Sequence, residues 1–204
     1  MDYFLVIFFS YLSGAIPFGL ILTKLFTNKD IRKIGSGNIG ATNVLRTGNK
    51  YLAGGTLILD ALKGYTPIII TNNFFPELIE LSCLLAFLGH LFPFWLNFKG
   101  GKGVATYLGI ITALSIQLSL LFIFTWIIIS LIFKYSSVSS MFASLTVLIV
   151  NVLRETVISA DSSLISTSNI PDTKILFIFF ILIVFSHRKN ILNLKNNNEN
   201  KIKI

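Results

Sequence analysis

The sequence predicts an all-α integral membrane protein, a polytopic helical bundle with seven transmembrane helices. Two observations predict this fold. First, 53% of the 204 residues are apolar and only 13% are charged, which gives a mean hydropathy of +0.77. Second, long runs nearly free of charge recur, and several reach the ~20 residues that a bilayer span requires. These runs are 3–23, 52–71, 78–96, 104–133 and 175–186.

The first apolar run, 3–23, predicts a retained transmembrane helix. Only Met1 and Asp2 precede it, so the basic segment that begins a secretory signal is not seen, and no small-residue cleavage site follows. Cys83 is the only cysteine and lies within an apolar run. We therefore expect a buried thiol with no disulfide, and no metal site built from cysteines.

The charges predict which loops face the cytoplasm. Basic residues gather in segments 24–50, 99–102 and 188–203, whereas acidic residues dominate 77–80 and 155–172. Because cytoplasmic loops of membrane proteins carry the excess of Lys and Arg, the three basic segments are predicted to lie inside. The net charge of +8 is then a sign of topology, and we expect no nucleic-acid partner.

If the run 104–133 were a single span, the number of membrane crossings would place the basic tail outside. The polar patch Ser115, Gln117 and Ser119 divides it, which predicts a hairpin of two short helices that returns Lys134 to the cytoplasm. Each half, of roughly 14 residues, reaches about 21 Å and falls short of the ~30 Å hydrocarbon core. Local thinning or a re-entrant pair, with five or six spans, stays an alternative. Segments 139–153 and 173–186 are the predicted sixth and seventh spans.

The first cytoplasmic segment contains a glycine-rich loop that could hold an anion. Glycines let backbone N–H groups turn inward, and Arg46 offers a planar fork that suits phosphate. The alternative is a structural turn with Arg46 as a topology anchor. A dinucleotide fingerprint is disfavoured, because the loop follows a transmembrane helix and not a strand. The candidate binding residues are Ser36, Gly37, Asn38, Thr42, Asn43 and Arg46.

The second segment, 90–106, places Lys102 between Gly101 and Gly103 at the predicted start of a helix. Free N–H groups and the positive end of the helix dipole favour an anion there. It is not a Walker A loop, since Leu96 occupies the position of the first glycine. The alternative is a membrane-edge lysine beside an aromatic belt.

The third segment, His187-Arg188-Lys189-Asn190-Ile191, follows the last predicted span. By itself a basic cluster there is typical of a topology signal. All three segments are predicted on one membrane face, however, so two phosphate-bearing molecules could be held there.

In order and spacing these segments resemble the three signatures of the acyl-phosphate:glycerol-3-phosphate acyltransferase family (PlsY), over nearly the whole chain. Segment 59–64, Leu-Asp-Ala-Leu-Lys-Gly, also resembles the family. The third signature departs from the pattern, with Asn193 in place of arginine and Asn197 in place of glycine, while Glu199 is kept. Asparagine tolerates a left-handed turn. The lost arginine raises the question of how tightly the tail is tethered.

The resemblance implies a single acyltransferase domain over 1–204, with motif loops at about 32–50, 90–106 and 187–199, in the bacterial inner membrane with its site facing the cytoplasm. It implies transfer of an acyl group from acyl phosphate to the sn-1 hydroxyl of glycerol 3-phosphate, giving lysophosphatidic acid and phosphate. We expect no cofactor or metal, a monomer in contact with membrane lipid, and a functional link to an enzyme that produces acyl phosphate.

The roles assigned from this resemblance divide between two substrates. Lys102, with the N–H groups of Gly101 and Gly103 and with Ser140, is expected on the acyl phosphate. Arg46, His187 and Asn190 are expected on glycerol 3-phosphate, with Ser36 shaping the pocket. A histidine paired with an aspartate five positions on is absent, since Trp95 and Leu192 stand at that spacing. A general base of this His–Asp type is therefore unsupported. The resemblance to the family implies that a phosphate oxygen of glycerol 3-phosphate takes the hydroxyl proton.

Two further expectations concern Asp60 and Lys63 and the rival function. Asp60 and Lys63 lie one helical turn apart, which predicts an intramembrane ion pair that supports the site. The rival function is a transporter of a phosphate-bearing or lipid anion. Two observations count against a transporter. The basic residues lie in loops, whereas a transporter would need its binding residues near the membrane midplane, and no inverted repeat is visible.

Overall fold

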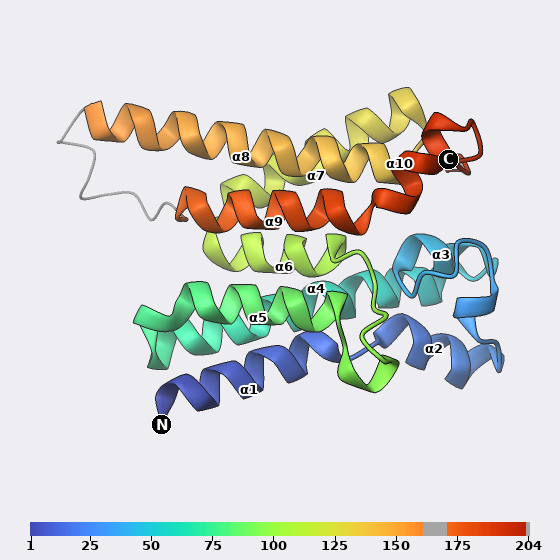
Figure 1. Ribbon diagram of the computed structural model, residues 1–204, viewed down its shortest axis with the longest axis horizontal. Coiled ribbons are helices and arrows are strands. Elements are labelled where there is room, and N and C mark those ends of the chain that lie inside the picture. The colour runs from blue at the N-terminus through green and yellow to red at the C-terminus, as the bar shows by residue number, and fades with distance from the viewer. Residues whose placement is uncertain (161–170, 203–204) are drawn as a thin grey trace. The chain divides into compact units, whose positions relative to one another are not determined.

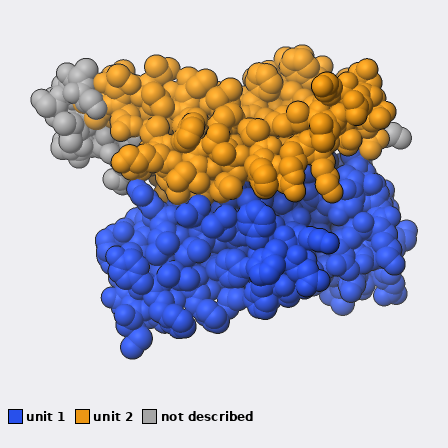
Figure 2. All heavy atoms as spheres, in the orientation of Figure 1, with its two compact units in different colours: residues 1–113 blue, residues 114–204 orange. Residues whose placement is uncertain are grey.

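The computed structural model describes residues 1–160 and 171–202, and the described chain consists of helices, turns and loops (Figure 1). The predicted all-α class is confirmed. Contacts between Cα atoms divide the chain into two compact units, residues 1–113 and residues 114–204 (Figure 2). The expectation of one acyltransferase domain over 1–204 stays a prediction, because this division concerns packing and not activity.

The first apolar run is two helices, α1 (Asp2–Ala15) and α2 (Phe18–Thr27), which meet at an angle of 40°. The prediction of one helix over 3–23 is therefore wrong in its continuity. Pro17 is the cause, because proline disfavours the helical conformation of the residue before it, and Ile16 is extended, with φ −65° and ψ 118°. The break leaves carbonyls that need donors. Trp95 Nε1 donates to Ala15 O at 2.7 Å, and Lys63 Nζ donates to Ile16 O at 2.6 Å.

The rest of the first unit is built on three longer helices, which pack through glycines. They are α4 (Lys50–Phe74), α5 (Ile79–Leu91) and α6, which begins at Val104 and ends at Leu114. A Cβ atom at Gly14, Gly64 or Gly109 would fall within 2.3 Å of a neighbouring helix carbonyl oxygen. Small residues of this kind let membrane helices approach closely. The short elements between them are η1 (Ile31–Lys33), α3 (Ala41–Leu45), η2 (Pro76–Leu78) and η3 (Phe94–Leu96).

The second unit contains α7 (Ile116–Phe133), α8 (Ser136–Ala160), α9 (Thr173–Ser186) and α10 (Arg188–Lys195). The predicted break of the run 104–133 at Ser115 is confirmed, and Ser115 Oγ caps α7 by accepting from Leu118 N. The halves are unequal, 11 and 18 residues, so the predicted equal lengths are wrong. Helix α9 has the predicted bounds, whereas α8 begins before and ends after the predicted 139–153.

The number of membrane crossings stays a prediction. By length and composition, the described helices include three candidate spans, Pro76–Leu96, Ile116–Phe133 and Ser136–Ile158, or up to five if each bent helix pair counts as one. Helix α6 is shorter than these candidates, and α4 has 25 residues but carries Asp60 and Lys63. The predicted outer segment 155–172 falls largely outside the described residues.

Candidate active site

The first glycine-rich loop is organised by the side chain of Asn43, which is 2% exposed. Its Nδ2 donates to the carbonyls of Ile31, Ile34 and Asn38 at 3.1, 2.9 and 2.7 Å, and its Oδ1 accepts from Ser36 N at 3.0 Å. An amide has two hydrogens, so both are engaged by the loop. Asn43 therefore shapes this loop, and its predicted direct contact with a substrate stays a prediction.

Around this amide, the loop exposes three polar side chains, those of Ser36, Thr42 and Arg46. Gly35 and Gly37 have φ of +56° and +71°, a left-handed conformation that favours glycine. A Cβ atom on Gly35 would lie 2.8 Å from Arg46 Cδ, so the arginine chain packs beside this glycine. Asn38 Oδ1 accepts from Gly40 N at 3.0 Å and helps to close the turn. The result is a rigid loop whose exposed donors suit an anion.

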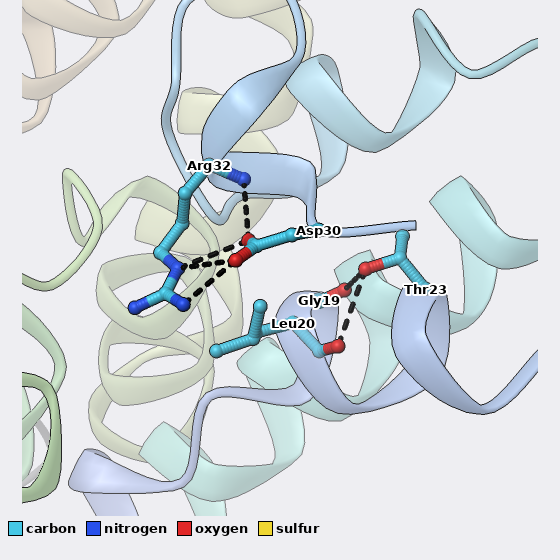
Figure 3. A network of polar contacts seen from close by, with 5 residues as sticks. All are labelled: Gly19, Leu20, Thr23, Asp30 and Arg32. Carbon is cyan, nitrogen blue, oxygen red and sulfur yellow. Dashed lines mark hydrogen bonds and ion pairs between the residues drawn. The ribbon is translucent and has the colours of Figure 1, made fainter. Parts of the chain in front are cut away.

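Asp30 and Arg32 fix the entry to this loop, while Thr23 Oγ1 in the preceding helix donates to Gly19 O and Leu20 O within that helix (Figure 3). Asp30 accepts from Arg32 N at 3.0 Å and from its guanidinium at 2.7 Å. The hydrogen bond from the Arg32 side chain lowers the pKa of Asp30 from 3.8 to about 2. Because this pKa is depressed, the stabilisation is complete above pH 4 and is lost as the pH falls through about 2. Both groups are solvated, so the contribution is small.

The second loop, Gly100–Gly103, is held against the end of α5. Gly100 N donates to Leu91 O at 3.0 Å, and Gly101 N donates to His90 O at 3.1 Å. A Cβ atom on Gly101 would lie 2.1 Å from His90 Nε2, and one on Gly103, whose φ is +82°, would lie 2.4 Å from the Phe87 ring. The glycines are thus needed for close packing, which the sequence did not reveal.

This packing leaves fewer backbone donors for a phosphate than predicted. The N–H of Gly101 is already used by His90, so the roles of Gly101 and Gly103 toward a substrate stay predictions. Lys102 is half-buried, whereas Lys99 is exposed. The two lysines, which are equivalent as topology signals, therefore differ in their surroundings.

Beneath the second loop lies a buried polar cluster. Lys63 Nζ lies 2.8 Å from Asp60 Oδ1, which confirms the predicted ion pair. His90 Nδ1 lies 3.0 Å from Thr106 Oγ1 and 4.0 Å from Asp60 Oδ1. The pattern of an aspartate five positions after a histidine could not identify Asp60, because Asp60 lies before His90 in the chain. Both partners face the same ring nitrogen, whereas a relay through histidine needs one at each nitrogen, so no general-base triad forms.

The third motif belongs to the second unit. His187 and Asn190 are 2% and 8% exposed. His187 Nδ1 lies 2.8 Å from Ile183 O, to which it donates, and Asn190 Nδ2 donates to Glu199 Oε1. Glu199 also accepts from Ser137 Oγ at 3.1 Å. The carboxylate thus fixes the amide of Asn190 and joins the tail to α8.

The tail is tethered despite the missing arginine at Asn193. Ile202 N donates to Lys134 O at 2.7 Å, in addition to the bonds made by Glu199. Asn197 has φ +56°, so the expectation that asparagine tolerates the left-handed turn is confirmed. Ser140 donates to Ser136 O at 2.8 Å and accepts from Trp126 Nε1 at 3.1 Å. Its only hydrogen is engaged, and its role toward a substrate stays a prediction.

Within the first unit the first two motifs share one hydrophobic core. Leu96 of the second motif packs against a cluster that underlies the first loop, formed by Leu20, Ile31, Ile39, Val44, Leu52 and Ala53. The third motif and Ser140 lie in the second unit. Sequence reasoning missed the loop-supporting positions of Asn43 and His90.

Comparison with known proteins identifies the family. The family model for glycerol-3-phosphate acyltransferase matches residues 4–197. A glycerol-3-phosphate acyltransferase of Pelagibacter ubique is 49% identical over 204 residues, covering 100% of both chains. One of Mesorhizobium japonicum is 49% identical over 199 residues, covering 97% of this chain and 95% of its relative.

Two crystal structures of PlsY, an integral membrane glycerol 3-phosphate acyltransferase, share the fold. The glycerol 3-phosphate form has a TM-score of 0.85 at 32% identity, and the lysophosphatidic acid form has 0.83 at 31%. Both alignments cover 100% of this chain and 96% of the other. The chain therefore belongs to the glycerol-3-phosphate acyltransferase family of integral membrane enzymes.

Proposed function

We propose that this enzyme transfers an acyl group from acyl phosphate to the sn-1 hydroxyl of glycerol 3-phosphate at the cytoplasmic face of the bacterial inner membrane. The acceptor is supported by the relatives' names and by PlsY structures in glycerol 3-phosphate and lysophosphatidic acid forms. The donor is supported by the resemblance of the three motifs to the acyl-phosphate-dependent family. The observation that carries the proposal is a pair of ordered glycine loops in one unit, each with a cationic side chain.

The reaction needs positioning and electrostatics more than a basic side chain. The glycerol oxygen forms a bond to the acyl carbon, the bond from that carbon to the phosphate oxygen breaks, and inorganic phosphate leaves. The hydroxyl proton passes to a phosphate oxygen of glycerol 3-phosphate. His90 is buried and bonded to Thr106, so it is poorly placed to take that proton. Lys102 neutralises charge on the leaving phosphate.

Arg46, Ser36, His187 and Asn190 are assigned to glycerol 3-phosphate. His187 Nδ1 donates to Ile183 O, which fixes the orientation of the ring that is assigned to glycerol 3-phosphate. Asn190 is held at a fixed rotation by Glu199, which suits recognition of a small polyol. Arg46 supplies the planar fork for its phosphate.

The direct test is an assay of the purified protein in detergent. With acyl phosphate and glycerol 3-phosphate it should form lysophosphatidic acid, measured by mass spectrometry, and EDTA should not reduce the rate. A transporter would form no product. Efficient turnover with acyl-CoA alone would contradict the proposed donor.

The proposed orientation has a separate test. A reporter that is active only in the cytoplasm should be active when fused after Ile204 and inactive when inserted near Ser162, two positions that lie outside the described residues. Activity at both positions would contradict an odd number of crossings between the acidic segment and the tail. The monomeric state is proposed as well, and light scattering of the detergent complex measures it.

A further inference from the structure

The Gly100–Gly103 loop rests on a buried polar cluster drawn from three helices. The cluster consists of Asp60 and Lys63 of α4, His90 of α5 and Thr106 of α6, which are 2%, 4%, 3% and 0% exposed. Buried polar side chains inside a membrane protein are costly, so they are kept where they serve a site. None of these four residues has been assigned above to a substrate.

His90 contacts the loop on both sides of Lys102. Before the lysine, its carbonyl accepts from Gly101 N at 3.1 Å, and its ring lies where a Cβ atom of Gly101 would be, 2.1 Å from Nε2. After the lysine, Nδ1 lies 3.0 Å from the hydroxyl of Thr106, in the first turn of α6. The backbone carbonyl of His90 therefore holds Gly101 before the cationic residue, while its imidazole packs against Gly101 and bonds Thr106 after that residue.

A buried ion pair lies beside the imidazole. Asp60 Oδ1 lies 4.0 Å from Nδ1, on the same side of the ring as Thr106. Asp60 is paired with Lys63, whose Nζ donates at 2.6 Å to Ile16 O at the break between α1 and α2. The broken first span, the ion pair and the loop are thus joined through His90.

We propose that His90 is a positioning residue that sets where Lys102 meets the phosphate of the acyl donor. The ring bonds Thr106 and packs against Gly101, so its action passes through the loop. This inference rests on the proposed function, in which Lys102 binds acyl phosphate. Loss of the His90 contacts should therefore weaken use of acyl phosphate while use of glycerol 3-phosphate is kept.

The experiment compares substitutions at His90 in the full chain in detergent. His90→Leu removes the ring nitrogens, whereas His90→Asn retains a hydrogen-bonding group near Nδ1. We expect His90→Leu to raise the KM for acyl phosphate roughly tenfold, as loss of about one buried hydrogen bond implies, and the KM for glycerol 3-phosphate to stay within about twofold. His90→Asn should recover part of the difference.

A matched control is Ser82→Ala, on the same helix. Ser82 is 0% exposed and its Oγ lies 2.9 Å from Ser10 Oγ, so the substitution removes a buried hydrogen bond without touching the loop. It should lower thermal stability and leave the ratio of the two KM values unchanged. If His90→Leu does not fold, Thr106→Val and Thr106→Ser replace it, because valine loses and serine keeps the hydroxyl that faces Nδ1.

The outcomes separate the two proposals. Turnover of acyl phosphate by the wild-type enzyme, with both KM values of His90→Leu unchanged or raised equally, overturns the positioning role alone. The same holds if Thr106→Val and Thr106→Ser behave alike. A wild-type enzyme that does not use acyl phosphate refutes the proposed donor, and this inference with it.

Discussion

The two glycine-rich loops of the first unit read alike in sequence but are held by different forces. The first loop is organised by hydrogen bonds, since one amide, that of Asn43, joins three carbonyls and one N–H. The second uses no side-chain amide: two backbone hydrogen bonds join it to the end of α5, and Gly101 and Gly103 pack against the rings of His90 and Phe87. The first loop therefore depends on the chemistry of one side chain, and the second on the absence of side chains.

The cationic residues of the two loops, Arg46 and Lys102, also differ in their exposure to solvent. Arg46 is exposed beside a loop whose backbone is closed on itself, whereas Lys102 is half-buried in a loop pressed against a helix end. An exposed guanidinium can adjust to a mobile, polar acceptor. A lysine in a packed loop has less freedom, which suits a group that must meet charge developing at one place.

The largest effect is expected at the cationic residue of the packed loop. Lys102→Ala should lower the rate by about 10²–10³, because it removes an electrostatic donor at the reacting centre. Lys99→Ala is the control, since Lys99 is exposed three residues away, and it should do much less. The measurements are the turnover rate and the membrane insertion of both lysine variants. If both insert normally and lose activity equally, Lys102 has no phosphate role.

The next effect tests the hydrogen-bonded loop. Asn43→Ala should leave three carbonyls and the N–H of Ser36 without this partner, and each buried group left unsatisfied costs about 1–3 kcal/mol. We expect loss of activity together with a lower unfolding temperature. Asn49→Ala removes only the cap that accepts from Leu52 N, and should cost about 1 kcal/mol with activity kept. Equal losses in the two variants would contradict the organising role of Asn43.

A smaller effect is expected from volume in the packed loop. Gly101→Ala places a methyl group where the His90 ring lies, and overpacking of this kind costs about 1–3 kcal/mol. Gly54→Ala is matched to it, because a Cβ atom at that helical glycine meets nothing within 4 Å, and it should be neutral or stabilising. Thermal unfolding and turnover of both variants measure the contrast. A silent Gly101→Ala would mean that the loop is not held by packing.

The smallest effect is expected in the tail of the second unit. Asn197 has φ +56°, a conformation that glycine adopts without the steric cost paid by other residues. Asn197→Gly should therefore raise the free energy of unfolding by less than about 1 kcal/mol, and Asn197→Ala should lower it by about 1 kcal/mol. Chemical denaturation compares the two. A gain in stability from alanine would show that the turn does not require this conformation.

Local signals in the sequence determined the helices and several of their ends. Apolar length, charge and capping act over a few residues, so the helical class, the break at Ser115 and the bounds of α9 followed from neighbours in the chain. The left-handed turn at Asn197 was expected instead from the family resemblance, in which glycine stands at that position. The break at Pro17 had an equally local cause, and weighing the proline against the apolar run would have found it.

Only the tertiary structure decided what supports the two loops. The amide of Asn43 bonds carbonyls up to twelve residues away, a supporting role that the loop sequence did not indicate. Asp60, thirty residues before His90, was beyond any fixed spacing, yet it lies 4.0 Å from Nδ1 because α4 and α5 pack together. Such contacts depend on how helices approach one another. The residue types along the chain determine which side-chain groups are available, whereas helix packing determines which partner each group contacts.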